Sequence, residues 1–194
     1  GITSTLDTID DALQTMDDTE DIREVMKVCV ERSYSMSRFI TNFADVVKIP
    51  EPQLEEVHLN DRVVACKIFM ENLCQHRDID LQLDLCEENP LVSMDTSLFE
   101  QVIINIIKNA TESIDTHGKV IICTSSVPLM LEIGDTGRGI SKEVESKLFS
   151  PFFSTKPNGQ GIGLIFIREV LMKHGCTFSL RTYQDGITRF KIFF

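Results

Sequence analysis

The feature that most constrains the fold of this chain is a run of mostly apolar residues spaced alternately by four and three positions between residues 22 and 47. Its members are Ile22, Met26, Cys29, Ser33, Met36, Ile40, Phe43 and Val47. This spacing brings one side chain per turn onto a single helix face, as in a coiled coil, and therefore predicts one long helix. The same spacing between residues 2 and 16 predicts a shorter first helix, which ends before an acidic break at residues 17–19.

The two predicted helices are joined by only a few residues, which favours an antiparallel hairpin. A lone hairpin has too little partner surface to bury both apolar seams, so we expect two copies to form a homodimeric four-helix bundle. Pro50 and Pro52 end the second helix, because proline lacks the amide donor and disfavours helix in its predecessor. We therefore expect a hairpin over residues 1–48, a linker over 49–57 and a second domain over 58–194.

The second domain has a mixed pattern. Helices are expected near residues 61–75, 97–114 and 162–174, and strands near 79–85, 91–94, 120–124, 129–133, 178–182 and 189–194. Ser97 and Glu100 have the spacing of a capping box at the start of the second of these helices. Strands interleaved with helices predict an α+β fold, with one sheet backed by helices in an α/β sandwich.

The composition excludes several classes of protein. The 30 acidic and 19 basic residues give a formal net charge of −11, which repels nucleic acid. No run approaches the roughly 20 apolar residues of a membrane helix, so we expect no membrane contact by this chain. Six cysteines without a C-x-x-C pair favour neither a disulfide framework nor a zinc site, and indicate a reducing, cytoplasmic location.

Two glycine-rich segments are candidates for ligand binding. In the first, residues 134–140, Asp135 follows an apolar strand, and Gly137 and Gly139 let backbone come close to a ligand. In the second, residues 158–164, three glycines precede a helix, which frees backbone N–H groups for phosphate beside the positive helix end. A plain tight turn and a flexible loop remain the alternatives when each segment is taken alone.

A third candidate is a pair of asparagines, Asn105 and Asn109, which lie four positions apart on an otherwise apolar helix and so share a face. Amides on a buried face are costly unless they bind something, and a side-chain carbonyl oxygen suits Mg²⁺. The alternative is that the two amides cap neighbouring loops.

In this order and spacing, and with the segment Leu148–Lys156 between the glycine segments, these elements resemble the N box, glycine boxes and F box of the GHKL ATPase superfamily. Residues 151–164 resemble the sensor histidine kinases of the nitrogen-regulatory type, which have a short ATP lid. The resemblance implies a transmitter region in which a GHKL-type domain binds ATP and Mg²⁺. It also implies transfer of the γ-phosphate to a histidine, with a response regulator receiver domain as the partner.

The resemblance also implies roles for individual residues. Asp135 would accept the adenine amino group, Asn109 would coordinate Mg²⁺, and Asn105 and Asn109 would be the catalytic pair. Phe152 and Phe153 would anchor the lid, or serve only as packing residues. The remaining cofactor-binding residues implied are Gly137, Gly139, Ile140, Thr155, Lys156, Gly159, Gly161, Gly163, Leu164 and Thr188.

Asn105 distinguishes between members of the superfamily. Relatives that hydrolyse ATP carry a glutamate at this position to activate water, and an amide is unable to act as that base. The sequence therefore favours phosphoryl transfer over hydrolysis. A GHKL ATPase, a serine-directed kinase and a degenerate nucleotide-binding scaffold remain the rival interpretations.

The sequence departs from the family pattern at the phosphoacceptor. Sensor kinases phosphorylate a histidine on the first hairpin helix, whereas the four histidines here are His58, His76, His117 and His174, all outside the predicted hairpin. The simplest hypothesis is that the sequence is truncated at its N-terminus and that the histidine belongs to the missing turns.

Overall fold

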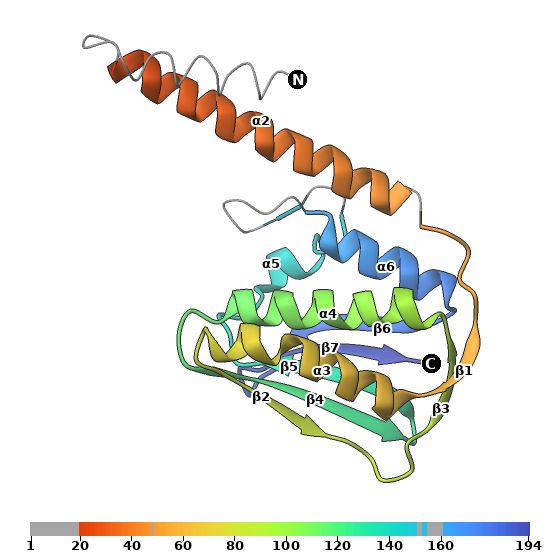
Figure 1. Cartoon of the computed structure of the whole chain (residues 1–194). Coiled ribbons are helices and arrows are strands. Elements are labelled where there is room, and N and C mark those ends of the chain that lie inside the picture. The colour runs from red at the N-terminus through yellow and green to blue at the C-terminus, as the bar shows by residue number, and fades with distance from the viewer. Residues whose placement is uncertain (1–19, 48, 151–152, 155–160) are drawn as a thin grey trace. The chain divides into compact units, whose positions relative to one another are not determined.

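The computed structural model describes residues 20–47, 49–150, 153–154 and 161–194. The chain divides into two compact units, residues 1–48 and residues 49–194. The first unit contains helix α2 (Glu20–Val47), which confirms the long helix expected over residues 22–47 (Figure 1). The helix expected over residues 2–16 lies outside the described residues.

Helix α2 presents large apolar side chains that contact little within the described part of its own unit. Ile22, Met36 and Ile40, three members of the predicted seam, are 53%, 66% and 60% exposed. None of the helices in the described ranges combines the length and apolarity required to cross a membrane.

The second unit is built on a five-stranded sheet in the order β2-β4-β5-β7-β6. Its strands are β2 (Ile79–Asp84), β4 (Gly118–Ser126), β5 (Leu129–Asp135), β7 (Thr188–Phe193) and β6 (Thr177–Thr182). Strand β2 runs parallel to β4, and the other neighbours are antiparallel. Strands β1 (Glu55–His58) and β3 (Leu91–Met94) form a separate antiparallel pair.

Three helices cover one face of this sheet, as Figure 1 shows, so the expected α/β sandwich is confirmed. They are α3 (Leu59–Gln75), α4 (Thr96–Ser113) and α6 (Gly163–Lys173), and a short helix α5 (Lys142–Glu145) follows β5. Alternate residues of the central strands, such as Leu131 and Ile192, are buried beneath the helices, as the two-residue period of a strand requires. Val102 and Ile103 of α4 complete the core from the other side.

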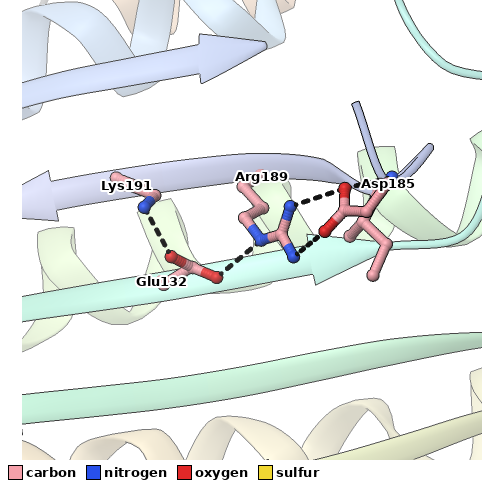
Figure 2. Close-up of polar contacts among 5 residues, drawn as sticks. Glu132, Asp185, Arg189 and Lys191 are labelled. Atoms are coloured by element: carbon pink, nitrogen blue, oxygen red, sulfur yellow. Dashed lines mark hydrogen bonds and ion pairs between the residues drawn. The ribbon is translucent and has the colours of Figure 1, made fainter. Parts of the chain in front are cut away.

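The opposite face of the sheet is polar. Glu132 on β5 accepts hydrogen bonds from Arg189 Nε and Lys191 Nζ on β7, both at 3.0 Å. Arg189 also donates two hydrogen bonds to Asp185 in the turn before the strand, and Figure 2 shows its guanidinium between the two carboxylates. With charged side chains on one face and the core on the other, the second unit has two layers.

Two expectations were wrong at the local level. The cap of α4 is Asp95, whose carboxylate accepts from Leu98 N at 3.0 Å, so Ser97 lies inside the helix and forms no capping box. The segment expected to be a linker also belongs to the second unit. Ile49 is 9% exposed, Lys173 Nζ donates to the Ile49 carbonyl oxygen, and residues 55–58 form β1.

Candidate functional site

Asp135 is the centre of the candidate site. It is the last residue of β5 and is 7% exposed, so this central strand ends on a buried carboxylate. Its Oδ1 accepts two hydrogen bonds, from the Ser113 hydroxyl at 2.7 Å and from the Gly137 backbone N–H at 2.9 Å. Both donors therefore approach the same oxygen.

The second oxygen of Asp135 is left for another group. No hydrogen bond from the described residues reaches Oδ2. Burial raises the pKa of Asp135 above its usual value, while the bonds from Ser113 and Gly137 oppose that rise. The result is a largely desolvated carboxylate whose second oxygen accepts no hydrogen bond from the described residues.

The turn after β5 is fitted closely to Asp135. A Cβ at Gly137 would collide with the Ser113 hydroxyl and lie 2.7 Å from the Ser113 carbonyl oxygen. That carbonyl accepts from Arg138 N at 3.1 Å, which fixes the turn against the end of α4. Gly139 has φ +76°, a conformation that side chains rarely adopt. Both glycines are therefore required by the backbone itself.

Thr188 is the residue opposite Asp135 in the register between β7 and β5. It is 5% exposed, and its hydroxyl lies 2.9 Å from the hydroxyl of Thr182. Thr182 in turn accepts a hydrogen bond from the backbone N–H of Ile140 at 2.7 Å. The structure thus brings Asp135, Gly137, Gly139, Ile140 and Thr188 together at one end of the sheet.

Helix α4 brings polar residues toward this end. Asn105, Asn109 and Ser113 lie at four-residue intervals and therefore on one helix face. Because Ser113 contacts Asp135, the same face approaches the site from the helix layer, with Asn109 one turn earlier. Asn105, a further turn back, donates from Nδ2 to the Gln101 carbonyl oxygen at 3.0 Å.

The second glycine segment ends at the start of α6. Gly161 has φ +65°, and Gly163 is the first residue of the helix. The cap residue Ile162 makes no side-chain hydrogen bond to the first turn of α6, so among the described residues no N-cap side chain satisfies the first N–H groups of this helix. Leu164 packs against the core and holds this turn in place. An uncapped helix N-terminus suits an anionic group.

The lid region is described in part. Phe152, Thr155, Lys156 and Gly159 lie outside the described residues. Phe153 is half-buried, and its backbone N–H donates to the Ser150 carbonyl oxygen at 3.2 Å. The aromatic anchor that the structure shows is Phe149, whose ring centroid lies 5.2 Å from that of Phe178 and 6.4 Å from that of Phe190. Arg168 on α6 donates to the Phe149 carbonyl oxygen at 3.0 Å.

Sequence reasoning missed Ser113, Thr182 and Phe149. Ser113 continues the four-residue spacing of the two asparagines, and that signal was available. Thr182 has no such pattern, because its partners Ile140 and Thr188 are reached only when β6 pairs with β7.

Comparison with known proteins agrees with this geometry. The sequence model of the family described as "Histidine kinase-, DNA gyrase B-, and HSP90-like ATPase" matches residues 94–194, more than half of the chain. The sensor histidine kinase ZraS of Escherichia coli is 23% identical over 171 residues, which cover 87% of this chain and 37% of ZraS. The nitrogen regulation protein NtrY of Azorhizobium caulinodans is 23% identical over 177 residues, or 84% of this chain and 23% of NtrY. The chain thus spans only about a third or less of the length of these relatives.

Solved structures similar to this chain are also histidine kinases. The catalytic domain of the histidine kinase ThkA superposes with a TM-score of 0.66 at 26% identity, covering 72% of this chain and 93% of that domain. A crystal structure of ThkA in complex with the response regulator TrrA gives a TM-score of 0.73 at 21% identity, over 97% of this chain and 56% of the other, and shows the shared fold. The relatives named above are sensor histidine kinases, and the chain itself belongs to the histidine kinase-, DNA gyrase B- and HSP90-like ATPase family.

Proposed function

We propose that this chain binds MgATP and transfers the γ-phosphate to a histidine side chain. One observation carries the proposal: a buried carboxylate, Asp135, keeps one oxygen available at the end of β5, directly across the register from Thr188. The adenine edge offers an amino donor beside a ring-nitrogen acceptor, which matches a carboxylate beside a hydroxyl. Membership of an ATPase family supports ATP as the nucleotide.

Asn109 is the residue that would hold Mg²⁺. Its side-chain oxygen is a hard ligand of the kind Mg²⁺ prefers. Among the described residues, no group of three or more histidine, cysteine, aspartate and glutamate side chains could hold a metal ion. The donor set therefore fits an ion that arrives with the nucleotide and takes most of its oxygens from phosphate and water. Bound there, the ion would neutralise charge on the phosphates.

The phosphates would lie toward the start of α6. Its uncapped first turn, opened by Gly161 and Gly163, offers backbone N–H groups and the positive end of the helix. We assign Lys156, Thr155 and Gly159 to the same end as a proposal from the resemblance alone. Asn105 carries an amide where a general base would be needed to activate water, which supports phosphoryl transfer over hydrolysis.

The acceptor and the partners are proposals from the family. None of the four histidines lies on α2, so the phosphoacceptor is not on this helix. ThkA forms a complex with a response regulator, and we infer that this chain also serves such a partner. The exposed apolar side chains of α2, Ile22, Met36 and Ile40, support a homodimer through this unit.

Titration calorimetry with ATP, with and without Mg²⁺, tests the nucleotide site. We expect a Kd in the micromolar range for the unmodified chain, about −6 to −8 kcal/mol. Asp135→Asn should weaken binding by about tenfold to a hundredfold, because an acceptor becomes a donor facing the adenine amino group. Asn109→Ala should remove the Mg²⁺ dependence and leave Mg²⁺-free binding little changed. Asp84→Asn is the matched control, because it makes the same change at an exposed carboxylate on β2. An unmodified chain that binds no ATP with Mg²⁺ present would refute the proposal.

A further inference from the structure

Two hydroxyl side chains lie directly behind the two polar groups of the base site. Ser113, at the end of α4, contacts Oδ1 of Asp135 at 2.7 Å. Thr182, at the end of β6, lies 2.9 Å from the hydroxyl of Thr188. Neither belongs to the glycine segments or to the asparagine pair that point to nucleotide binding. Each controls what its neighbour can offer to a ligand.

The Ser113 hydroxyl has one proton and two acceptors within reach. These are the Ala110 carbonyl oxygen at 2.8 Å and Asp135 Oδ1 at 2.7 Å. An ionised carboxylate is the stronger acceptor, and hydrogen bonds to it are about twice as strong as neutral ones. The proton therefore goes to Oδ1, where the Gly137 N–H also donates. With Oδ1 occupied by two donors, Asp135 faces a ligand through Oδ2 as an acceptor only.

The Thr182 hydroxyl contacts a backbone donor and a second hydroxyl. Its oxygen already accepts from the Ile140 N–H at 2.7 Å, so its proton points elsewhere. Thr188 Oγ1 lies 2.9 Å away, and either hydroxyl of this pair is able to donate to the other. The Ile140 N–H already occupies one lone pair of Thr182, which favours Thr182 as the donor to Thr188. A Thr188 oxygen that accepts from Thr182 has its own proton left to donate. In this arrangement the Thr188 hydroxyl, which is 5% exposed, is the donor toward the site.

We propose that Ser113 and Thr182 are positioning residues that fix the hydrogen-bond polarity of the base site, with Asp135 held as acceptor and Thr188 held as donor. The inference rests on the proposed nucleotide binding and adds the reason for base selectivity. An amino donor next to a ring-nitrogen acceptor, as in adenine, satisfies both groups. Hypoxanthine presents the reverse order, an oxygen acceptor next to a ring N–H donor. Asp135 would then face an acceptor and Thr188 would face a donor, so neither hydrogen bond forms.

Ligands that lack one contact atom test each residue separately. Purine riboside triphosphate lacks the amino group read by Asp135, and 1-deaza-ATP lacks the ring nitrogen read by Thr188. Ser113→Ala should weaken ATP binding about tenfold but purine riboside triphosphate less than about twofold. Thr182→Val, which keeps the side-chain shape without the hydroxyl, should weaken ATP about tenfold but 1-deaza-ATP less than about twofold.

Matched variants control for general damage. Thr182→Ser retains the hydroxyl and should restore the affinity for ATP. Ser113→Cys keeps the volume with a weaker donor and should fall between serine and alanine. Ser125→Ala, on the polar face of β4, should leave the affinity for ATP and for the analogues unchanged. Thermal unfolding of each variant identifies any that fails to fold, and the Thr182 pair then tests the idea independently of Ser113.

The outcomes separate this inference from the proposed function. Equal losses for ATP and for the analogue in both variants would make the hydroxyls merely structural and would overturn the inference. Unchanged ATP affinity in both variants would overturn it as well. An unmodified chain that binds neither ATP nor the analogues would instead refute nucleotide binding itself. An unmodified chain that binds inosine triphosphate as well as ATP would show that the site has no fixed polarity.

Discussion

The Ser113 hydroxyl lies 2.7 Å from Oδ1 of Asp135, although the two residues are 22 positions apart in the sequence. The contact joins the last residue of α4 to the last residue of β5. Since the same helix face carries Asn109 one turn earlier, this contact sets where the asparagine stands relative to the carboxylate. The positions of Asp135 and Asn109 are therefore coupled through one side chain.

Asp135→Asn is expected to stabilise the protein without nucleotide at neutral pH. Burial raises the pKa of Asp135, so the folded state penalises the ionised form. The unfolded chain ionises first as the pH rises, and the penalty is complete only above the raised folded-state value. The asparagine variant should therefore gain stability over the unmodified chain as the pH rises from 3 to 7, as followed by urea denaturation. A gain that is equal at both ends of this range would contradict the burial penalty.

Gly137→Ala should destabilise the protein and abolish ATP binding together. Its Cβ would collide with the Ser113 hydroxyl, and overpacking of this kind costs about 1–3 kcal/mol. Gly163→Ala is the matched comparison, because a Cβ there meets no atom within 4 Å. That change should leave stability unchanged or raise it by up to about 1 kcal/mol, since alanine favours the helix. Thermal unfolding of the two variants measures this difference in stability, and equal destabilisation by both changes would contradict the prediction.

Asp185→Asn should alter stability only above strongly acid pH. The side-chain hydrogen bonds from Arg189 lower the pKa of Asp185 to about 2, from 3.8 without such partners. A lowered folded-state value contributes stability above 3.8 that is lost as the pH falls through about 2. The difference between the two proteins should thus be constant from pH 7 to 5 and vanish near pH 2. Asp84→Asn serves as control, because Asp84 makes no ion pair with the described residues.

Met36→Glu should weaken self-association through α2. Met36 is 66% exposed and belongs to the predicted seam, so a charge there would be buried in a dimer. We expect the dimer dissociation constant, measured by sedimentation equilibrium, to rise by at least about tenfold. Val28→Glu makes the same change at a residue that is 50% exposed but lies off the seam, and should have a smaller effect. A monomeric unmodified chain would contradict the proposed dimer.

The sequence by itself determined the features that depend on short-range spacing. The long helix over α2, the strands and helices of the second unit other than β1 and α5, and the placement of Asp135 at a strand end follow from periods of about 3.6 and 2 residues. The order of the glycine segments and the asparagine pair was enough to identify the family, because the chemistry of a nucleotide site is carried by residue types at fixed spacings. The expected contacts of Phe152, Thr155, Lys156 and Gly159 remain predictions.

Only the tertiary structure decided which distant residues meet. Thr182 lies 42 positions after Ile140, and their hydrogen bond exists because β6 pairs with β7 at the edge of the sheet. Asp95 replaced Ser97 as the cap of α4, and it also accepts from Gln53 N at 2.9 Å, which ties the expected linker to the second unit. A local pattern reports which face of an element is apolar. It carries no information on the register and packing that bring a particular hydroxyl to a particular carboxylate.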